Sequence, residues 1–174
     1  MKLYLVRHGE VLHNVLKQYN TADEDLTEKG VEQAKKLREV LNGQKFDAVY
    51  SFPLIRALHT AEIIVGREED IVCDERLRER DAGSLSGTSL DESNREEYWN
   101  YNSNLVQGTS ENIKDFFARV KEFIDELKKK GYHKVLIVAH SGVSKAFRFY
   151  FEGEEDGMFL NKGLGNCEVR EYEL

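Results

Sequence analysis

Residues that could do chemistry follow two short apolar runs of this 174-residue chain. Arg7 and His8 come directly after the run Leu3–Val6, and His140 comes directly after the run Lys134–Ala139. An imidazole can attack or carry a proton near neutral pH, and a guanidinium offers a planar fork of donors that suits phosphate or carboxylate. These residues indicate chemistry on an anionic group, although a charged turn after an edge strand would have the same composition.

Whether these side chains meet depends on the elements that carry them. Both apolar runs have the length of buried strands. Further strands are predicted over residues 47–51, 71–73 and 167–173, and helices over residues 27–43, 53–65 and 110–131 and through 145–149. This alternation predicts one domain over residues 1–174, a three-layer α/β/α sandwich with a mostly parallel sheet. Parallel neighbours bring their carboxyl ends to one edge, so His8 and His140 are expected at a shared site there.

Single residues sharpen these predictions. Thr27 is expected to cap the helix that ends before Gly43, and Pro53 is expected to be the first residue of the next helix. Gly9 is expected to let the backbone turn sharply beside His8, because glycine has no Cβ.

Composition limits the class of protein. The net charge of −7 argues against a general nucleic-acid binder, because such a protein needs a basic face for phosphates. The N-terminal apolar run is too short for a signal peptide or a membrane span, so no membrane partner is expected. Cys73 and Cys167 are isolated, and the usual metal-binding and nucleotide-binding motifs do not occur, which favours a cytoplasmic protein.

Residues 77–110 have a different character, irregular and punctuated by glycines. Three aromatic residues, Tyr98, Trp99 and Tyr101, lie there among charged and amide side chains. Two interpretations stay open. These aromatic residues form either a lid over a substrate or the inner face of a short helix that caps the core.

The polar turns belong to a longer series of motifs. The series is Arg7–Glu10 with Asn14, Asp23 with Leu26–Thr27 and Gly30-x-x-Gln33-Ala34, Ser51 with Arg56-Ala57 and Thr60-Ala61, Leu77 to Gly87, Val138–His140, and Asn166. Over nearly its whole length the chain thus resembles the histidine phosphatase superfamily, also called the phosphoglycerate mutase-like family. Two positions depart from that family: Ser141 stands where glycine is usual after the second histidine, and Asp25 stands where proline is common.

The resemblance implies a mechanism through phosphohistidine. His8 would be the nucleophile, with its other ring nitrogen held by a backbone carbonyl. Arg7 and Arg56 would bind the phosphate oxygens and keep His8 neutral, and His140 would be a further donor. Glu79 would be the general acid that protonates the leaving group.

Other assignments are weighed beside these. Asn14 and Ser141 are expected to contact substrate, and Ser141 is tolerable unless its position needs a conformation open only to glycine. Glu79 has an alternative interpretation as part of a surface ion-pair cluster with the arginines around it. Glu10 is expected to be a helper at most. The remaining histidines are interpreted as structural: His13, His59 and His133.

The function implied is a metal-independent phosphomonoesterase for a small phosphorylated metabolite, with no metal and no cofactor. A cofactor-dependent phosphoglycerate mutase would share the pocket but needs a lid and extra cations, and Arg95 is the only basic residue in the short segment Thr88–Thr109. A phosphatase for protein phosphohistidine would not need Glu79, and a non-catalytic anion-binding member would lack pocket residues. The natural substrate and the oligomeric state stay open.

Overall fold

The computed structural model describes residues 1–66, 70–153 and 157–174. Its strands are β1 (Lys2–Arg7), β2 (Ala48–Ser51), β3 (Ile71–Cys73), β4 (Lys134–Ala139) and β5 (Val169–Glu173). Its α-helices are α1 (Leu12–Leu16), α2 (Glu28–Val40), α3 (Ile55–Val65), α4 (Arg95–Tyr98), α5 (Ile113–Leu127) and α6 (Ser141–Glu152). Short 3₁₀ turns lie at Glu75–Leu77, Gly83–Leu85, Leu90–Glu92 and Lys128–Lys130.

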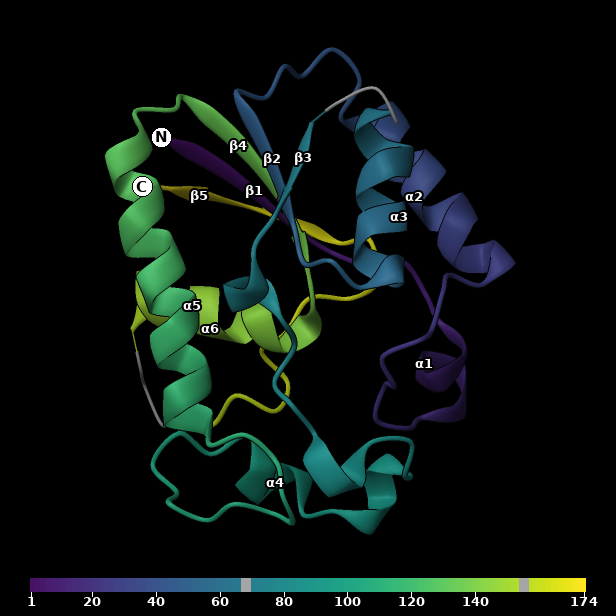
Figure 1. Ribbon diagram of the computed structural model, residues 1–174, viewed down its shortest axis with the longest axis vertical. Coiled ribbons are helices and arrows are strands. Elements are labelled where there is room, and N and C mark those ends of the chain that lie inside the picture. The colour runs from purple at the N-terminus through teal and green to yellow at the C-terminus, as the bar shows by residue number, and fades with distance from the viewer. Residues whose placement is uncertain (67–69, 154–156) are drawn as a thin grey trace.

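The strands of the described residues form one sheet in the order β3-β2-β4-β1-β5. All neighbours are parallel except β5, which runs antiparallel to β1. In the register of β1 and β4, Val6 lies opposite Val138 and Arg7 lies opposite Ala139. The turns that follow these two strands therefore meet at one edge of the sheet, as predicted (Figure 1).

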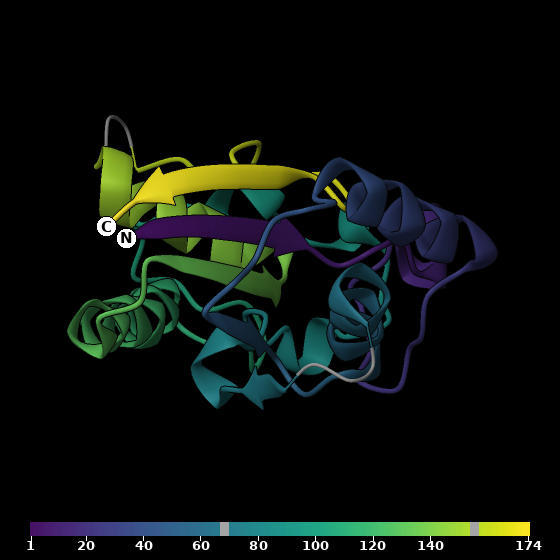
Figure 2. The same cartoon turned by 90° about the horizontal axis from the view of Figure 1, so that it is seen from above.

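Alternate residues of β1 face two separate cores. Leu3 and Leu5 pack with residues of α5 and α6, whereas Tyr4 and Val6 pack with residues of α2 and α3. Figure 1 shows α5 on one side of the sheet and α2 and α3 on the other. The chain ends lie next to each other (Figure 2). The Met1 amine donates a hydrogen bond to the Leu174 carbonyl at 2.7 Å. This is the predicted three-layer α/β/α sandwich with a mostly parallel sheet.

The helix and strand ends agree with the predictions at some positions and differ at others. The Thr27 hydroxyl accepts a hydrogen bond from the Gly30 N–H at 3.1 Å, so it caps α2 as expected. Pro53 is not the first residue of α3, because the Leu54 carbonyl accepts the first helical hydrogen bond and α3 begins at Ile55. Strand β5 begins only at Val169, since the preceding Cys167 has φ 52°, outside the range of a strand.

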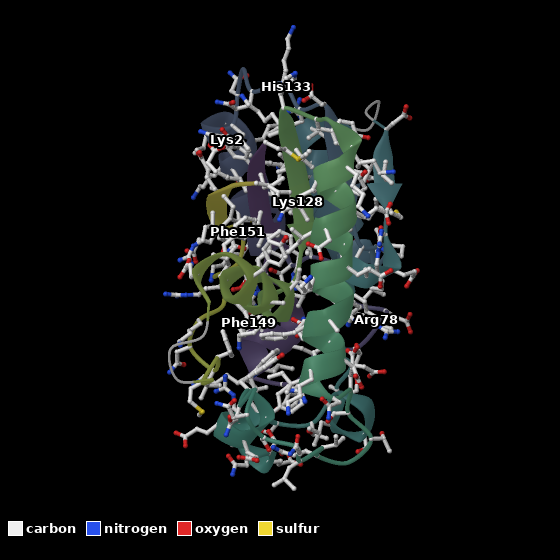
Figure 3. The ribbon with its side chains drawn as sticks, turned by 90° about the vertical axis from the view of Figure 1, so that its left-hand side faces the viewer. Lys2, Arg78, Lys128, His133, Phe149 and Phe151 are labelled. Carbon is white, nitrogen blue, oxygen red and sulfur yellow. The ribbon has the colours of Figure 1, made fainter. Side chains whose placement is uncertain are left out.

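The aromatic stretch around α4 packs against the core. Tyr98 and Trp99 are buried, and the ring of Tyr101 lies 4.7 Å from that of Phe149 between centroids. Phe149 is labelled in Figure 3 beside α5, whose Phe117 it contacts at 5.3 Å. The stretch therefore caps the core, and Tyr98 and Trp99 also line the cavity described below. No helix in the described parts of the chain is both long and apolar enough to cross a membrane.

Candidate active site

A cavity of about 610 Å³ opens at the carboxyl ends of β1 and β4. Seven of the residues singled out in the sequence line it: Arg7, His8, Asn14, Arg56, Glu79, Ser141 and Asn166. His140 lies directly behind this lining, with its ring 5.1 Å from that of His8 between centroids. The fold thus brings together every residue predicted for the site.

His8 is held in the tautomer that a nucleophilic imidazole needs. Its Nδ1 lies 2.7 Å from the Gly9 carbonyl oxygen, and because a carbonyl only accepts, Nδ1 carries the proton and Nε2 keeps its lone pair. Burial lowers the pKa of His8 well below its ordinary 6.5, and the charges of Arg7 and Arg56 lower it further. The ring is therefore neutral at pH 7, chiefly through burial rather than through the arginines to which the sequence analysis assigned this effect.

Arg7 and Arg56 converge beside His8 from two different elements. Arg7 ends β1, and its Nη1 donates to the Leu164 carbonyl at 3.0 Å. Arg56 lies in the first turn of α3, and its Nη1 donates to the Thr21 carbonyl at 2.7 Å. The Nε atoms of both are buried with no partner among the described residues. Each guanidinium is thus anchored by one nitrogen and keeps donors for an anion.

His140 caps α6 and is 1% exposed. Neither of its ring nitrogens has a hydrogen-bond partner in the part of the chain that the structure describes. Burial lowers the pKa of His140 well below 6.5, and the neighbouring Arg56 and His8 lower it further. A buried polar group without a partner costs free energy, and an anion beside His8 would satisfy it.

Asn166 fixes the backbone of the residue that carries the nucleophile. Its Nδ2 donates to the His8 carbonyl and to Asn14 Oδ1, both at 3.0 Å. The N–H of Cys167 donates to the Arg7 carbonyl at 3.0 Å. The segment before β5 therefore ties down the turn after β1, a role that the sequence analysis did not assign to Asn166.

Gly9 is a glycine for a reason other than the one predicted. Its φ does not lie in the left-handed region. A Cβ at Gly9 would lie 2.6 Å from the Gly30 carbonyl oxygen, and a Cβ at Gly30 would overlap the Glu10 carbonyl oxygen. Close backbone packing against the start of α2, rather than a sharp turn, excludes a side chain here. The Gly9 N–H donates to Thr60 Oγ1 at 3.1 Å, which also ties the turn to α3.

Glu79 lies at the N-terminus of α6, the helix that follows His140. Its Oε2 accepts from the Gly142 N–H at 2.9 Å, and its Oε1 accepts from the Arg80 N–H at 2.8 Å. Both oxygens are thus held by backbone donors, which aims the carboxyl group at the cavity it lines.

The arginines around Glu79 make other contacts, which argues against the surface ion-pair interpretation. Arg76 pairs with Asp74 at 2.7 Å and with Glu126 at 2.8 Å. Arg80 is buried and donates to backbone carbonyls, including that of Tyr98, whose ring it covers.

Arg119 of α5 supports the acid-bearing segment, and the sequence analysis missed it. Its guanidinium donates to the carbonyls of Arg76 and Arg78 at 2.8 Å and to that of Glu79 at 3.1 Å, and it pairs with Glu111 at 2.8 Å. The only signal was a cation three residues after Phe116 on an otherwise apolar face.

Of the two residues after His140, Ser141 tolerates a side chain and Gly142 does not. Ser141 is the first residue of α6 and does not have the positive φ that would require glycine, so the serine is tolerated. At Gly142 a Cβ would overlap Glu79 Oε1 and would lie 2.7 Å from Trp99 Cη2. The position that cannot carry a side chain is therefore one residue later than expected.

Lys145 is a second residue that the sequence analysis missed. It lies on α6, lines the cavity and is only 4% exposed. Burial lowers its pKa from 10.5 to about 7, against the attraction of Glu79. The available signal was a lysine five residues after His140, in a predicted helix where Val143, Ala146 and Phe147 are its apolar neighbours.

Residues assigned a minor role differ in their positions. Glu10 does not line the cavity, and its carboxylate pairs with Lys29 at 2.8 Å. The hydrogen bond from Lys29 lowers the pKa of Glu10. His13 does line the cavity, and its Nδ1 lies 2.6 Å from Glu24 Oε1.

The charged side chains of the lining suit an anion. Its cations are Arg7, Lys17, Arg56, Arg78, Arg80, Arg95 and Lys145, and its acids are Glu79 and Asp81. Local charge around the cavity thus opposes the net charge of the chain. Over residues 1–66, 70–153 and 157–174, no three His, Cys, Asp or Glu side chains are grouped so that they could hold a metal ion.

A family model described as "Histidine phosphatase superfamily (branch 1)" matches residues 3–174. The chain belongs to this superfamily. The match covers both polar turns, the segment of Glu79 and the final strand, so the fold and the site belong to one family pattern.

Relatives within the histidine phosphatase superfamily carry several names. The chain is 36% identical to a putative phosphoserine phosphatase 2 of Hydrogenobacter thermophilus, over 99% of this chain and 89% of that protein. It is 31% identical to a 2,3-bisphosphoglycerate-dependent phosphoglycerate mutase of Sinorhizobium fredii, with the same coverage. The crystal structure of the alpha-ribazole phosphatase from Shigella flexneri superposes with a TM-score of 0.86 at 27% identity, over 100% of this chain and 91% of that one. The chain is an enzyme, a phosphatase of the histidine phosphatase type.

Proposed function

We propose that the chain is a single-domain phosphomonoesterase that hydrolyses a small phosphorylated metabolite through a phosphohistidine at His8. The observation that carries this proposal is the state of His8, which is neutral, protonated on Nδ1 and flanked by Arg7 and Arg56. Dividing the reaction into two displacements lowers the barrier of a very slow hydrolysis.

In the first step Nε2 of His8 attacks phosphorus, the bond from phosphorus to the leaving oxygen breaks, and Glu79 gives that oxygen a proton. Arg7, Arg56 and His140 stabilise the charge on the non-bridging oxygens, which is greatest in the transition state. Asn14 of α1 and Ser141 at the start of α6 complete the phosphate contacts. In the second step water attacks phosphorus, Glu79 takes a proton from the water, and inorganic phosphate leaves neutral His8 behind.

Hydrolysis of a generic aryl phosphate by the purified chain tests the proposal directly. The arginines and histidines of the site already neutralise the phosphate, so EDTA should leave the rate unchanged. Orthovanadate, which adopts the five-coordinate geometry of the transition state, should inhibit. Loss of activity on chelation that a divalent ion restores would contradict the metal-independent mechanism.

The rival function is phosphoglycerate mutation, which mutase relatives of similar identity keep open. A mutase must hold water away from phosphohistidine while its intermediate turns over. The segment around α4 is fixed by packing against the core, although Arg95, Tyr98 and Trp99 also line the cavity, so it is not a free lid. We therefore expect that 3-phosphoglycerate, supplied with 2,3-bisphosphoglycerate, is isomerised no faster than phosphate is released. Isomerisation much faster than release would make the protein a mutase.

A further inference from the structure

We propose that Lys145 and Trp99 form a subsite for a carboxylate on the alcohol portion of the substrate, so that the preferred substrates are phosphate esters of hydroxy acids. This inference rests on the proposed phosphatase function and narrows its substrate class. It concerns the part of the cavity that the phosphate-binding residues do not occupy.

The subsite lies on the leaving-group side of the cavity. Gly142 donates its N–H to Glu79, the expected acid, and Lys145 follows one helical turn later on the same face of α6. Trp99 contacts both positions: a Cβ at Gly142 would lie 2.7 Å from its ring, and Lys145 Nζ lies 3.6 Å above its ring centroid. Because Glu79 protonates the leaving oxygen, the organic part of the substrate must lie beside these residues.

The Lys145 ammonium is under-satisfied. Of its three donors, one bonds the Leu160 carbonyl at 2.9 Å, and the group otherwise rests on the Trp99 ring. Among the described residues no carboxylate lies within ion-pair distance of it, and the attraction of Glu79 acts from farther away. A buried cation without a contacting carboxylate is costly, which is a reason to expect one from a ligand.

The charges that act on Lys145 also favour an incoming anion. Glu79 attracts its proton, whereas Arg95 of α4, Arg7 of β1 and Arg80 repel it. With burial these cations bring the pKa of Lys145 to about 7. A carboxylate bound at Lys145 would offset the burial and repulsion, and its single charge matches a single ammonium.

A matched pair of ligands isolates this contact. 3-Phosphoglycerate and glycerol 3-phosphate share the phosphate ester and the carbon chain and differ by a carboxylate against a hydroxymethyl group. Each would be measured as a competitive inhibitor of aryl phosphate hydrolysis, and its Kd would be measured by calorimetry on His8→Ala, which cannot turn it over. We expect the wild-type chain to bind 3-phosphoglycerate roughly 10- to 100-fold more tightly, the usual worth of a charge-assisted hydrogen bond.

Substitution of Lys145 should remove only this preference. In Lys145→Met the ratio of the two inhibition constants should fall to about one. Lys145→Arg should keep most of the preference, because it keeps the charge. The matched control is Lys128→Met. Lys128 also lies over an aromatic ring, that of Tyr150 at 4.9 Å, but in the exposed 3₁₀ turn after α5 (Figure 3).

The pH dependence of ligand preference distinguishes a binding role of Lys145 from a purely structural one. The protonated form binds a carboxylate, so the wild-type preference for 3-phosphoglycerate should be largest below pH 7 and should shrink as the pH rises through that value. Phosphate ionisation is common to both ligands and cancels in the ratio. In Lys145→Met the ratio should not depend on pH.

Three results would overturn the subsite. The first is a wild-type chain that binds the two ligands equally well. The second is an equal loss of affinity for both ligands in Lys145→Met, and the third is an unchanged ratio of their inhibition constants in that variant. If the wild-type chain does not hydrolyse the aryl phosphate, the proposed function fails, and the two calorimetric Kd values still decide the subsite. Thermal unfolding of each variant shows whether it is folded, and methionine is expected to be tolerated because it removes a buried charge.

Discussion

The two ends of the cavity are built in different ways. At the phosphate end, Arg7 is the last residue of β1, and His8 and His140 directly follow β1 and β4. Arg56 projects from the first turn of α3. At the leaving-group end, Glu79 and Trp99 come from irregular segments, and Lys145 comes from the interior of a helix. Strand ends fixed by sheet register make a rigid phosphate site, and the less regular end is free to vary with the substrate.

The largest change in rate that would separate the leaving-group end from the phosphate end is expected on substitution of Glu79. Glu79→Gln should slow alkyl phosphates by roughly 10²–10⁴-fold, the usual worth of general acid catalysis. Aryl phosphates with acidic leaving groups should lose less, because their leaving oxygens need less protonation. Steady-state kcat on both substrate types measures the difference.

The control for this prediction is Glu10→Gln. Glu10 is a carboxylate next to the same strand end, but it pairs with Lys29 outside the cavity. Its substitution should leave kcat within about threefold on both substrate types. Equal losses on alkyl and aryl phosphates in Glu79→Gln would mean that Glu79 only supports the pocket.

A smaller effect of the same kind is expected at Gly142. The methyl group of Gly142→Ala would push Glu79 away from its place at the start of α6. A displacement of about 1 Å can cost roughly 10²-fold, and the loss should again be greater for alkyl than for aryl phosphates. Gly165→Ala is the control, since its Cβ would meet nothing closer than 3.4 Å. If Gly142→Ala lowers both substrate types alike, the contact with Glu79 is not what excludes a side chain there.

The phosphate end predicts a dependence of stability on pH. His8 and His140 are neutral when folded because burial lowers both pKa values well below 6.5. As the pH falls below 6.5, these residues take up protons in the unfolded chain but not in the folded one. The free energy of unfolding therefore decreases progressively below pH 6.5. Each histidine should contribute a slope of about 1.4 kcal/mol per pH unit.

Urea unfolding at pH 7 and pH 5.5 measures this slope. The double variant His8→Asn with His140→Asn should lose less free energy of unfolding between these two pH values than the wild-type chain does. His133→Asn, at an exposed position before β4, is the control and should match the wild type. A double variant with the wild-type pH dependence would show that the two rings are not buried in their neutral form.

The same contrast explains what could be predicted from the sequence. His8 and His140 could be placed together because apolar runs mark buried strands, and parallel strands end at one edge. The reason why residue 9 is a glycine could not be predicted, because it depends on how closely the backbone of Gly30 approaches. Lys145 was missed because its place beside Trp99 depends on the path of the irregular residues 77–110, which have no period to interpret.

The central claim is that His8 becomes phosphorylated during turnover. Rapid acid-free quenching with a ³²P-labelled substrate should trap a phosphoenzyme that is labile to acid and stable to base, and peptide mapping should locate the label on His8. His8→Ala should show no label, while His133→Asn should be labelled like the wild type. Label that persists in His8→Ala, or turnover with no label at any time, would contradict the account.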